Sequence, residues 1–291
     1  MKNLKILFLA LTVTLVSFNV TAQEVLSPKA PKYPDGVYTK ENTRTRKAIP
    51  YTALREADVM WSKRIWRVID LREKMNHPLY YPDEQILDRK SLFDVIKDAA
   101  ITNGTITCFN QAATDDEFRY DMTKSEIEGM LIKWDSTATA EDPNNPGTFI
   151  SAPQKEEIST ISVWQYWVKE DWFFDKQRSV LDVRIIGLCP LVEKKTESGE
   201  STGASSPLFW IYFPEARPVF ANNEVYMRQN DAERRTFEDI FWKRMFSSYV
   251  RKESNVFNRG IFDYKTGLDQ LLEADRVKHD IFIYEHDLFH F

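Results

Sequence analysis

Two apolar, aromatic-rich segments separated by a four-residue turn place the strongest constraint on the fold. They span residues 158–174 and 179–192, and the turn between them reads Asp175-Lys176-Gln177-Arg178. In the second segment apolar residues alternate with charged ones, which is typical of an antiparallel strand with one buried face. The first segment is apolar on both faces, so both of its sides are expected to contact protein. The pattern predicts a β-hairpin over 158–192, and the sequence PLFWIYFP predicts a further short strand near 207–213.

The segment Leu54–Tyr81 carries apolar residues at helical spacing. Six of them lie on one stripe, at positions 54, 57, 61, 65, 68 and 75, while charged residues occupy the other side. This spacing predicts a long amphipathic helix that ends at Asn76-His77-Pro78. We expect the stripe that contains Trp61 to pack on the core and hold the domain together.

Apolar side chains also occur on the charged side of this predicted helix. Val59 and Trp66 are seven residues apart and therefore nearly in line, and Lys63 and Asp70 fall on the same side. A second surface should cover them, either another part of the chain or a partner. We predict a partner interface that contains Val59, Lys63, Trp66 and Asp70.

Further helices are predicted on both sides of the hairpin. Residues 91–103 precede Gly104 and form one helical pattern, before a short strand at 105–109, and the capping-box sequence Thr123-Lys124-Ser125-Glu126 introduces another helix. Helical patterns also cover 232–254 and 266–285. The predicted fold class is therefore α+β, an antiparallel sheet packed with several amphipathic helices.

Composition divides the chain into five regions. Residues 1–22 combine two lysines with an apolar run and are typical of a signal peptide, and residues 23–50 form an extended Pro-rich arm. A helix-rich half is expected at 51–134, a polar connector at 135–157 and an α+β half at 158–291, and the halves either form separate domains or share one core. A polar loop at 193–206 is expected to be mobile.

Two segments on either side of the connector are similar in sequence. Residues 58–66 read DVMWSKRIW and residues 239–246 read DIFWKRMF. The similarity suggests two related helix-plus-strand halves, and chance similarity is the alternative.

The charge balance argues against nucleic acid as a partner. Removing residues 1–22, which contain Lys2 and Lys5, leaves 37 basic and 44 acidic residues and a net charge of −7. Phosphate binding requires a basic surplus or a clustered basic face, and the sequence shows neither.

No catalytic constellation is found in the sequence. The chain lacks the nucleophile-elbow, zinc-protease, P-loop and dinucleotide-binding motifs, and it has only nine glycines. The acidic run Asp115-Asp116-Glu117 and the pair His286 and His290, with Asp287 beside it, are candidate ion sites. A solvated turn and a frayed tail explain them better. We therefore predict no enzyme activity, no catalytic or metal-binding residues and no cofactor.

Two modifications stay open on the sequence. Cys108 and Cys189 either form one disulfide in an oxidising compartment or pack as buried thiols. The sequence Asp135-Ser136-Thr137 is similar to a bacterial periplasmic O-glycosylation signal, so Ser136 is a candidate for sugar attachment.

Four segments of the chain carry a family resemblance. They are the arm with YPDGVYT, the helix-like EADVMWSKRIWRVIDLREKMNHPLYYP, the paired WFFDKQRSVLDVRIIGLCPL and the segment FEDIFWKRMFSSYVRKESNVFNR. Together they resemble the GldN/PorN family of periplasmic components of the type IX secretion and gliding-motility machinery, over essentially the whole chain after residue 22.

The resemblance implies a non-enzymatic structural subunit in the periplasm. It implies association with the outer membrane through a GldK/PorK-like lipoprotein, self-association in a large ring, and contact with a GldM/PorM-like inner-membrane motor or shaft protein. The alternative is a periplasmic protein that binds or hydrolyses glycans. It would use a platform made of Trp164, Tyr166 and Trp172.

Overall fold

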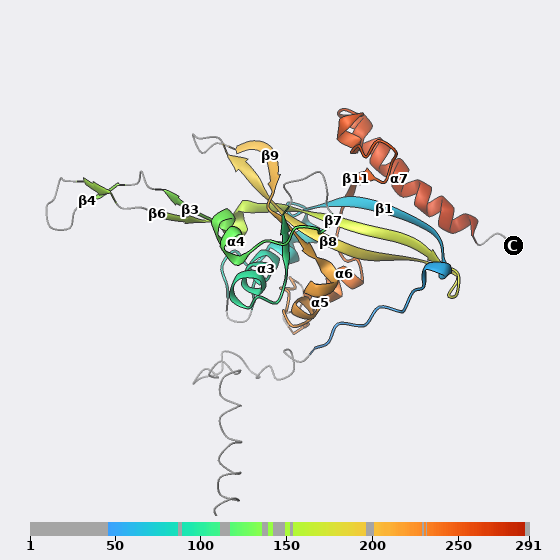
Figure 1. The fold of residues 1–291 in the computed structure, drawn as a ribbon, viewed down its shortest axis with the longest axis horizontal. Coiled ribbons are helices and arrows are strands. Elements are labelled where there is room, and N and C mark those ends of the chain that lie inside the picture. Colours follow the sequence, from blue (N-terminus) through green and yellow to red (C-terminus); the bar gives the residue numbers. More distant parts are fainter. Residues whose placement is uncertain are drawn as a thin grey trace, which may run out of the picture. The chain divides into compact units, whose positions relative to one another are not determined.

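One antiparallel sheet organises the chain (Figure 1). The computed structural model describes residues 46–86, 89–110, 117–135, 139–141, 149–151, 154–195, 201–228, 230 and 232–288. Within them, seven strands pair in the order β11-β1-β7-β8-β10-β2, and β9 pairs with β8. The strands are β1 (Val59–Asp70), β2 (Cys108–Asn110), β7 (Val163–Asp175), β8 (Val180–Lys195), β9 (Ser201–Pro207), β10 (Phe209–Tyr212) and β11 (Tyr249–Glu253).

Helices precede, separate and follow these strands. The α-helices are α2 (His77–Tyr80), α3 (Leu92–Lys97), α4 (Lys124–Leu131), α5 (Phe213–Ala221), α6 (Phe237–Trp242) and α7 (Leu268–Asp287). Shorter 3-10 turns and one π-turn are η2 (Glu56–Asp58), η3 (Lys74–Asn76), the π-turn η4 (Asp98–Thr102), η5 (Thr160–Ser162) and η6 (Ile261–Asp263). The mixture of one antiparallel sheet and helices confirms the predicted α+β class.

The hairpin prediction is confirmed. β7 and β8 pair from Val163 opposite Val192 to Asp175 opposite Val180, so the turn follows Asp175, as predicted. The Asp175 carboxylate accepts hydrogen bonds from the backbone N–H of Gln177, at 2.9 Å, and from the Arg178 side chain, at 2.7 Å. The short strand predicted near 207–213 is β10, which Phe213 and Pro214 convert into the start of α5.

The prediction of a helix over 54–81 is wrong. Its central part is β1, which pairs with β7 on one side and β11 on the other. Half of its twelve residues are β-branched or aromatic, and these side chains favour strands. Because β1 lies inside the sheet with its second half buried throughout, the two-residue alternation of a half-exposed strand is lost, and the remaining apolar positions imitate helical spacing.

The predicted helix over 232–254 is also largely wrong. Helix α6 covers only Phe237–Trp242, and Arg244 adopts a positive φ of 51°, which ends the helical path before β11 begins. The two similar segments at 58–66 and 239–246 therefore have different structures, a strand and a short helix, and the idea of two related halves is wrong.

Some of the remaining predicted elements are confirmed, and others have different boundaries or a different structure. Helix α3 with η4, the capping box of α4 and the terminal helix α7 are confirmed. The strand expected at 105–109 forms slightly later, as β2. Part of the predicted loop 193–206 forms strands instead, because β9 pairs with the end of β8.

The predicted connector contains strand pairs. β3 (Ile132–Asp135) pairs with β6 (Gln154–Glu157), and β4 (Thr139–Glu141) pairs with β5 (Phe149–Ser151). Strands from both sides of this segment belong to the main sheet, since β1 and β2 precede it and the other strands follow it.

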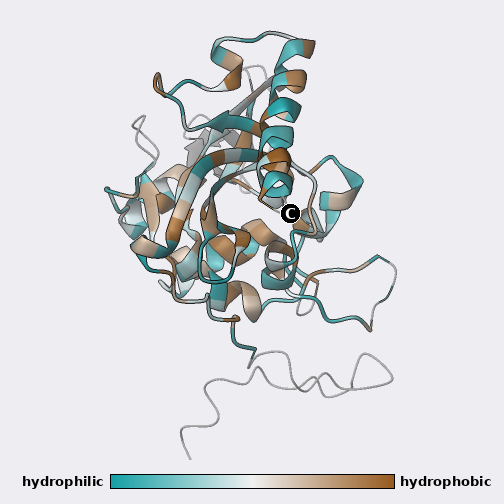
Figure 2. Ribbon diagram, turned by 90° about the vertical axis from the view of Figure 1, so that its right-hand side faces the viewer, coloured by the Kyte–Doolittle hydropathy of each residue, from teal (hydrophilic) through white to brown (hydrophobic). Residues whose placement is uncertain are grey.

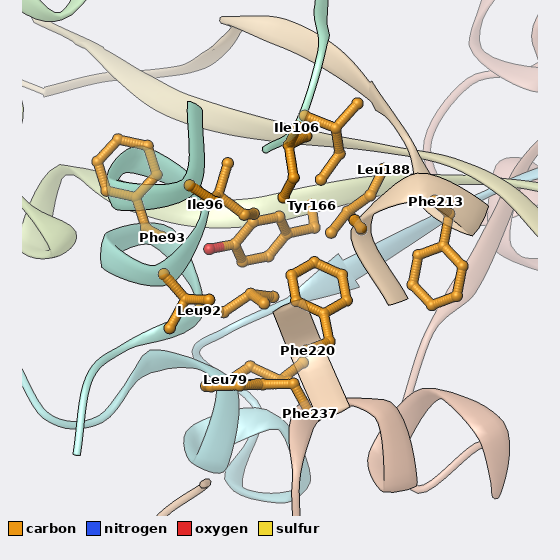
Figure 3. Close-up of a cluster of buried hydrophobic side chains, with 14 of the residues drawn as sticks. Leu79, Leu92, Phe93, Ile96, Ile106, Tyr166, Leu188, Phe213, Phe220 and Phe237 are labelled. Carbon is orange, nitrogen blue, oxygen red and sulfur yellow. The ribbon is translucent and has the colours of Figure 1, made fainter. Parts of the chain in front are cut away.

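A large apolar cluster fills the space between the sheet and helices α2 to α6 (Figure 3). At its centre Tyr166 of β7 is only 1% exposed, and Phe220 of α5 contacts the rings of Phe213, Phe237 and Phe241. The cluster also receives Leu92, Phe93 and Ile96 from α3. We call this set the main core.

A second, smaller cluster lies beneath α7. Ala274, Val277 and Ile281 of this helix pack on Ile65 of β1 and Val250 of β11, with Ile261 alongside. At the same end of β1, the Trp61 ring stacks on Tyr284, with ring centroids 4.4 Å apart. We call the set Ile65, Val250, Ile261, Ala274, Val277 and Ile281 the α7 cluster.

Candidate functional site

A pocket of about 530 Å³ opens where β1 leaves the sheet. Its volume falls in the range typical of ligand sites, about 300 to 1,000 Å³. It is lined mainly by aromatic and basic side chains. The aromatic ones are Tyr80, Tyr81, Trp164 and Tyr226, and the charged ones include Arg72, Lys74, Asp83 and Arg228. We call it the Trp164 pocket.

The end of β1 builds one wall of this pocket. Arg72 donates two parallel hydrogen bonds to the Asp70 carboxylate, from Nε at 2.9 Å and Nη2 at 2.6 Å, and its guanidinium lies 4.8 Å from the Trp164 ring centroid. Burial alone would raise the pKa of Asp70, but the hydrogen bonds from Arg72 and from Gln165 lower it below its ordinary value. The carboxylate therefore fixes Arg72 in place, and Arg72 covers one face of the indole.

Two tyrosines from separate segments also line the pocket. The rings of Tyr81 and Tyr226 are 4.6 Å apart, and the Arg89 guanidinium lies 5.6 Å from the Tyr226 ring. Burial and the neighbouring Asp83 carboxylate raise the pKa of Tyr80, so this phenol stays neutral. These tyrosine rings consequently present apolar surfaces that carry hydroxyl groups.

The chemistry of the pocket suits binding better than catalysis. The indole N–H of Trp164 is buried and finds no acceptor in the described part of the chain. Basic side chains outnumber the one carboxylate, Asp83, around aromatic walls. Such a lining favours a peptide ligand in which an apolar side chain is followed by an acidic group.

The four residues of the predicted interface lie apart from this pocket or inside the chain. Trp66 is 8% exposed and packs with Cys189 and Trp210, and the Nζ of Lys252 lies 4.3 Å from its ring. Asp70 is buried and bonded to Arg72, whereas Val59 and Lys63 are half-buried. Lys63 forms an ion pair with Glu253 of β11, at 2.6 Å. The helical faces that selected these residues do not exist, and a partner contact at Val59, Lys63, Trp66 or Asp70 stays a prediction.

A second site lies directly after the Pro-rich arm, at Tyr51, and no local sequence pattern predicted it. Tyr51 lies between the guanidinium groups of Arg217, 3.9 Å from its ring centroid, and Arg184, at 4.9 Å. Arg217 is buried and donates to the Glu238 carboxylate, at 2.8 Å from Nε. Burial raises the pKa of Glu238, and the hydrogen bond from Arg217 opposes that rise.

The arm is also held at its first described residue. Arg46 pairs with Asp239 at 2.8 Å, next to the N-terminus of α6. The arm therefore lies over α5 and α6 of its own chain. Ion pairs, cation–π contacts and a ring stack between residues far apart in the sequence create this contact, so local patterns could not reveal it.

The candidate chemical sites do not assemble. Cys108 and Cys189 are both buried free thiols, and burial raises the pKa of Cys108 to about 12 and that of Cys189 further. Among the described residues, no group of three His, Cys, Asp or Glu side chains could hold a metal ion. His286 is exposed beside Asp287, and His290, Asp115, Asp116 and Ser136 lie outside the described residues.

The proposed glycan platform does not form. Tyr166 is buried in the main core, whereas Trp172 is covered by the Arg244 guanidinium at 5.4 Å and Trp164 lines the pocket. The three rings therefore present no common surface.

No helix of the described segments has the length and hydropathy needed to cross a bilayer.

A family model described as "Gliding motility associated protein GldN" matches residues 54–290. This range contains the whole sheet, both clusters and the Trp164 pocket. The chain belongs to the GldN family. It is thus a gliding motility-associated protein, as the sequence resemblance indicated. No curated protein matches the chain.

Proposed function

We propose that this GldN-family chain is a non-enzymatic structural subunit of the envelope machinery for gliding motility and type IX secretion. It acts in the periplasm and assembles into a ring with a GldK/PorK-like outer-membrane lipoprotein. A GldM/PorM-like motor or shaft protein contacts the ring from the inner membrane. The observation that carries the proposal is the family match over residues 54–290.

The features of the chain support an assembly role. The sequence before residue 23 is typical of an export signal. Buried ionic contacts such as Arg217 with Glu238 join separate segments of the chain.

We further assign the contact with the lipoprotein to the Trp164 pocket. Its aromatic walls provide the kind of buried anchor that dominates protein interfaces. Lys74 and Arg228 lie at the pocket and match a carboxylate beside the inserted side chain. The expected occupant is a segment of the lipoprotein in which an aromatic or aliphatic residue precedes an acidic one.

The experiment is purification from crosslinked envelopes of cells that carry single substitutions. Tyr226→Ala removes one wall of the pocket and Lys74→Glu reverses an exposed rim charge. Both should reduce recovery of the lipoprotein about tenfold or more, a loss of about 1.4 kcal/mol. Gliding and secretion should fall in parallel.

The matched control is Tyr120→Ala, which removes an aromatic ring that is 68% exposed and does not line the pocket. It should leave recovery unchanged. If both pocket variants retain the lipoprotein, the docking site is elsewhere. If deletion of the whole chain leaves gliding and secretion intact, the proposed function itself is wrong.

A further inference from the structure

Helix α7 has two apolar stripes on roughly opposite sides. One stripe contains Ala274, Val277 and Ile281, which are buried on the sheet. At 100° per residue, the residues on the other side form a second stripe. Its apolar members are Leu268, Leu271, Leu272, Phe282 and Ile283, each between 42% and 70% exposed. Figure 2 shows brown residues recurring along this helix, which ends at the marked C-terminus.

The exposed stripe has the spacing of a helix-pairing seam. Steps of four and three residues connect its members, as in the a and d positions of a heptad repeat. The seam runs through positions 268, 272, 275, 279, 282 and 286, with Leu271 and Ile283 beside it. A helix of twenty residues is about 30 Å long, so this seam extends along its full length. Such a seam fits a second helix better than it fits a flat surface.

The order of residues in the seam indicates the identity of the partner helix. The seam is symmetric about Val277, with Asp275 and His279 two residues to either side and Leu272 and Phe282 five residues to either side. Leu271 and Ile283 are six residues away, and Leu268 and His286 nine. An antiparallel copy of the same helix would therefore place Leu272 opposite Phe282, Asp275 opposite His279 and Leu268 opposite His286.

We propose that α7 pairs with α7 of a second copy of this chain, antiparallel and about a two-fold axis at Val277. In this arrangement Leu272 packs on Phe282 of the other copy, and Leu268 packs on the edge of the His286 ring. The centre of the seam holds two identical hydrogen bonds, from each His279 imidazole to the Asp275 carboxylate of the other copy. Within one copy, the His279 ring already stacks on Phe282, with centroids 6.2 Å apart and 14° between the ring planes.

The charge of α7 argues against a membrane as the occupant. The helix carries six acidic residues against Arg276 and Lys278, so an anionic lipid surface would repel it. An unrelated partner helix would need no symmetry about Val277. The facing of Asp275 with His279 and of Leu272 with Phe282 in an antiparallel copy favours a second copy of this chain.

The contact has a defined place in an assembly. A two-fold contact closes on itself, so it joins copies in pairs and cannot by itself build a ring. One helix pair buries less than the roughly 1,200 Å² of a standard interface, so a weak contact is expected. It rests on α7 alone and is independent of the lipoprotein contact at the Trp164 pocket.

Disulfide crosslinking tests the direction and register. Full-length chain with Leu272→Cys is mixed with a tagged chain carrying Phe282→Cys and is then oxidised. The mixed pair should crosslink efficiently, because the two positions face each other. Each variant alone should crosslink poorly, because identical positions are offset by ten residues, about 15 Å, whereas a disulfide spans Cα atoms no more than about 7 Å apart.

The background for this experiment is low. Cys108 and Cys189 are buried, and the unsubstituted chain serves as the control. Efficient crosslinking of identical positions would indicate a parallel pair and would overturn the proposal. So would equal, low crosslinking in every combination.

Sedimentation measures the strength of the contact. Leu272→Asp should weaken self-association at least tenfold while the melting temperature stays within a degree or two, since the side chain is 59% exposed. The matched control is Met60→Asp, which introduces the same charge at a side chain that is 65% exposed. Met60 lies in β1 and is not a member of the α7 cluster.

A charge exchange separates a second copy from any other partner. His279→Asp alone places two carboxylates opposite each other and should weaken association. Combining it with Asp275→His restores both hydrogen bonds and should restore association to within about twofold. If the combination associates no better than the single variant, or if Leu272→Asp abolishes binding of another protein or of vesicles but leaves self-association unchanged, the proposal is wrong.

Discussion

The main core and the α7 cluster stabilise their helices in different ways. Helices α3, α5 and α6 bury most of their apolar side chains, and the rings of Phe213, Phe220 and Phe241 contact one another. Helix α7 is the longest helix of the described chain, yet it buries only Ala274, Val277 and Ile281. The length of a helix therefore does not determine how much of it is buried. The short helices pack in one large core, whereas α7 has a narrow inner contact and an equally apolar outer face.

The largest effect is expected in the main core. Phe220→Ala removes a fully buried ring between Phe213, Phe237 and Phe241. It should lower the free energy of unfolding by about 3 to 5 kcal/mol. Chemical denaturation gives this value, with Phe262→Ala, at a ring that is 49% exposed, as the control. A loss below about 1 kcal/mol would show that this packing is not essential.

A smaller effect is expected beneath α7. Ile281→Ala removes part of a side chain that is 5% exposed and should cost about 2 to 3 kcal/mol. Leu272→Ala, on the outer stripe of the same helix, should change the monomer by less than about 0.5 kcal/mol. Thermal melting at low protein concentration compares the two. Equal losses would mean that the outer stripe is also packed within the chain.

A still smaller and pH-dependent effect is expected where β1 leaves the main core. Asp70→Asn weakens the paired hydrogen bonds with Arg72 and should cost about 1 to 2 kcal/mol at pH 7. Because the pKa of Asp70 is lowered in the folded chain, its stabilisation is present above the unfolded value near 3.8 and is lost as pH falls through the folded value. The difference between native and Asn variants should therefore shrink as the pH falls from about 5 to below 3.8. A difference that is constant over this range would contradict the account.

The sequence predicted what depends on local chemistry. The β7–β8 turn follows from Asp175 and its neighbours, and the start of α4 follows from the pair Thr123 and Glu126. α7 was also predicted because its boundaries and length are local properties. The family resemblance predicted the function more specifically than any single motif did.

What failed depends on contacts between distant segments. Trp66 looked like a surface residue on a helix, but pairing of β1 with both β7 and β11 places it in a buried cluster with Lys252 over its ring. The Trp164 pocket combines residues near 72, 81, 164 and 226, and no local pattern connects them. Tertiary pairing overrides a helical spacing when a segment has two strand neighbours.

Hydrogen exchange at two protein concentrations tests the central claim about α7 most directly. Amides in α5 and β7 should exchange at rates that do not depend on concentration, because the main core is complete in one chain. Amides along α7 should become about tenfold or more protected as the concentration rises through the association range, and Leu272→Asp should abolish that gain. Protection of α7 that is independent of concentration, and equal to that of α5, would contradict the account.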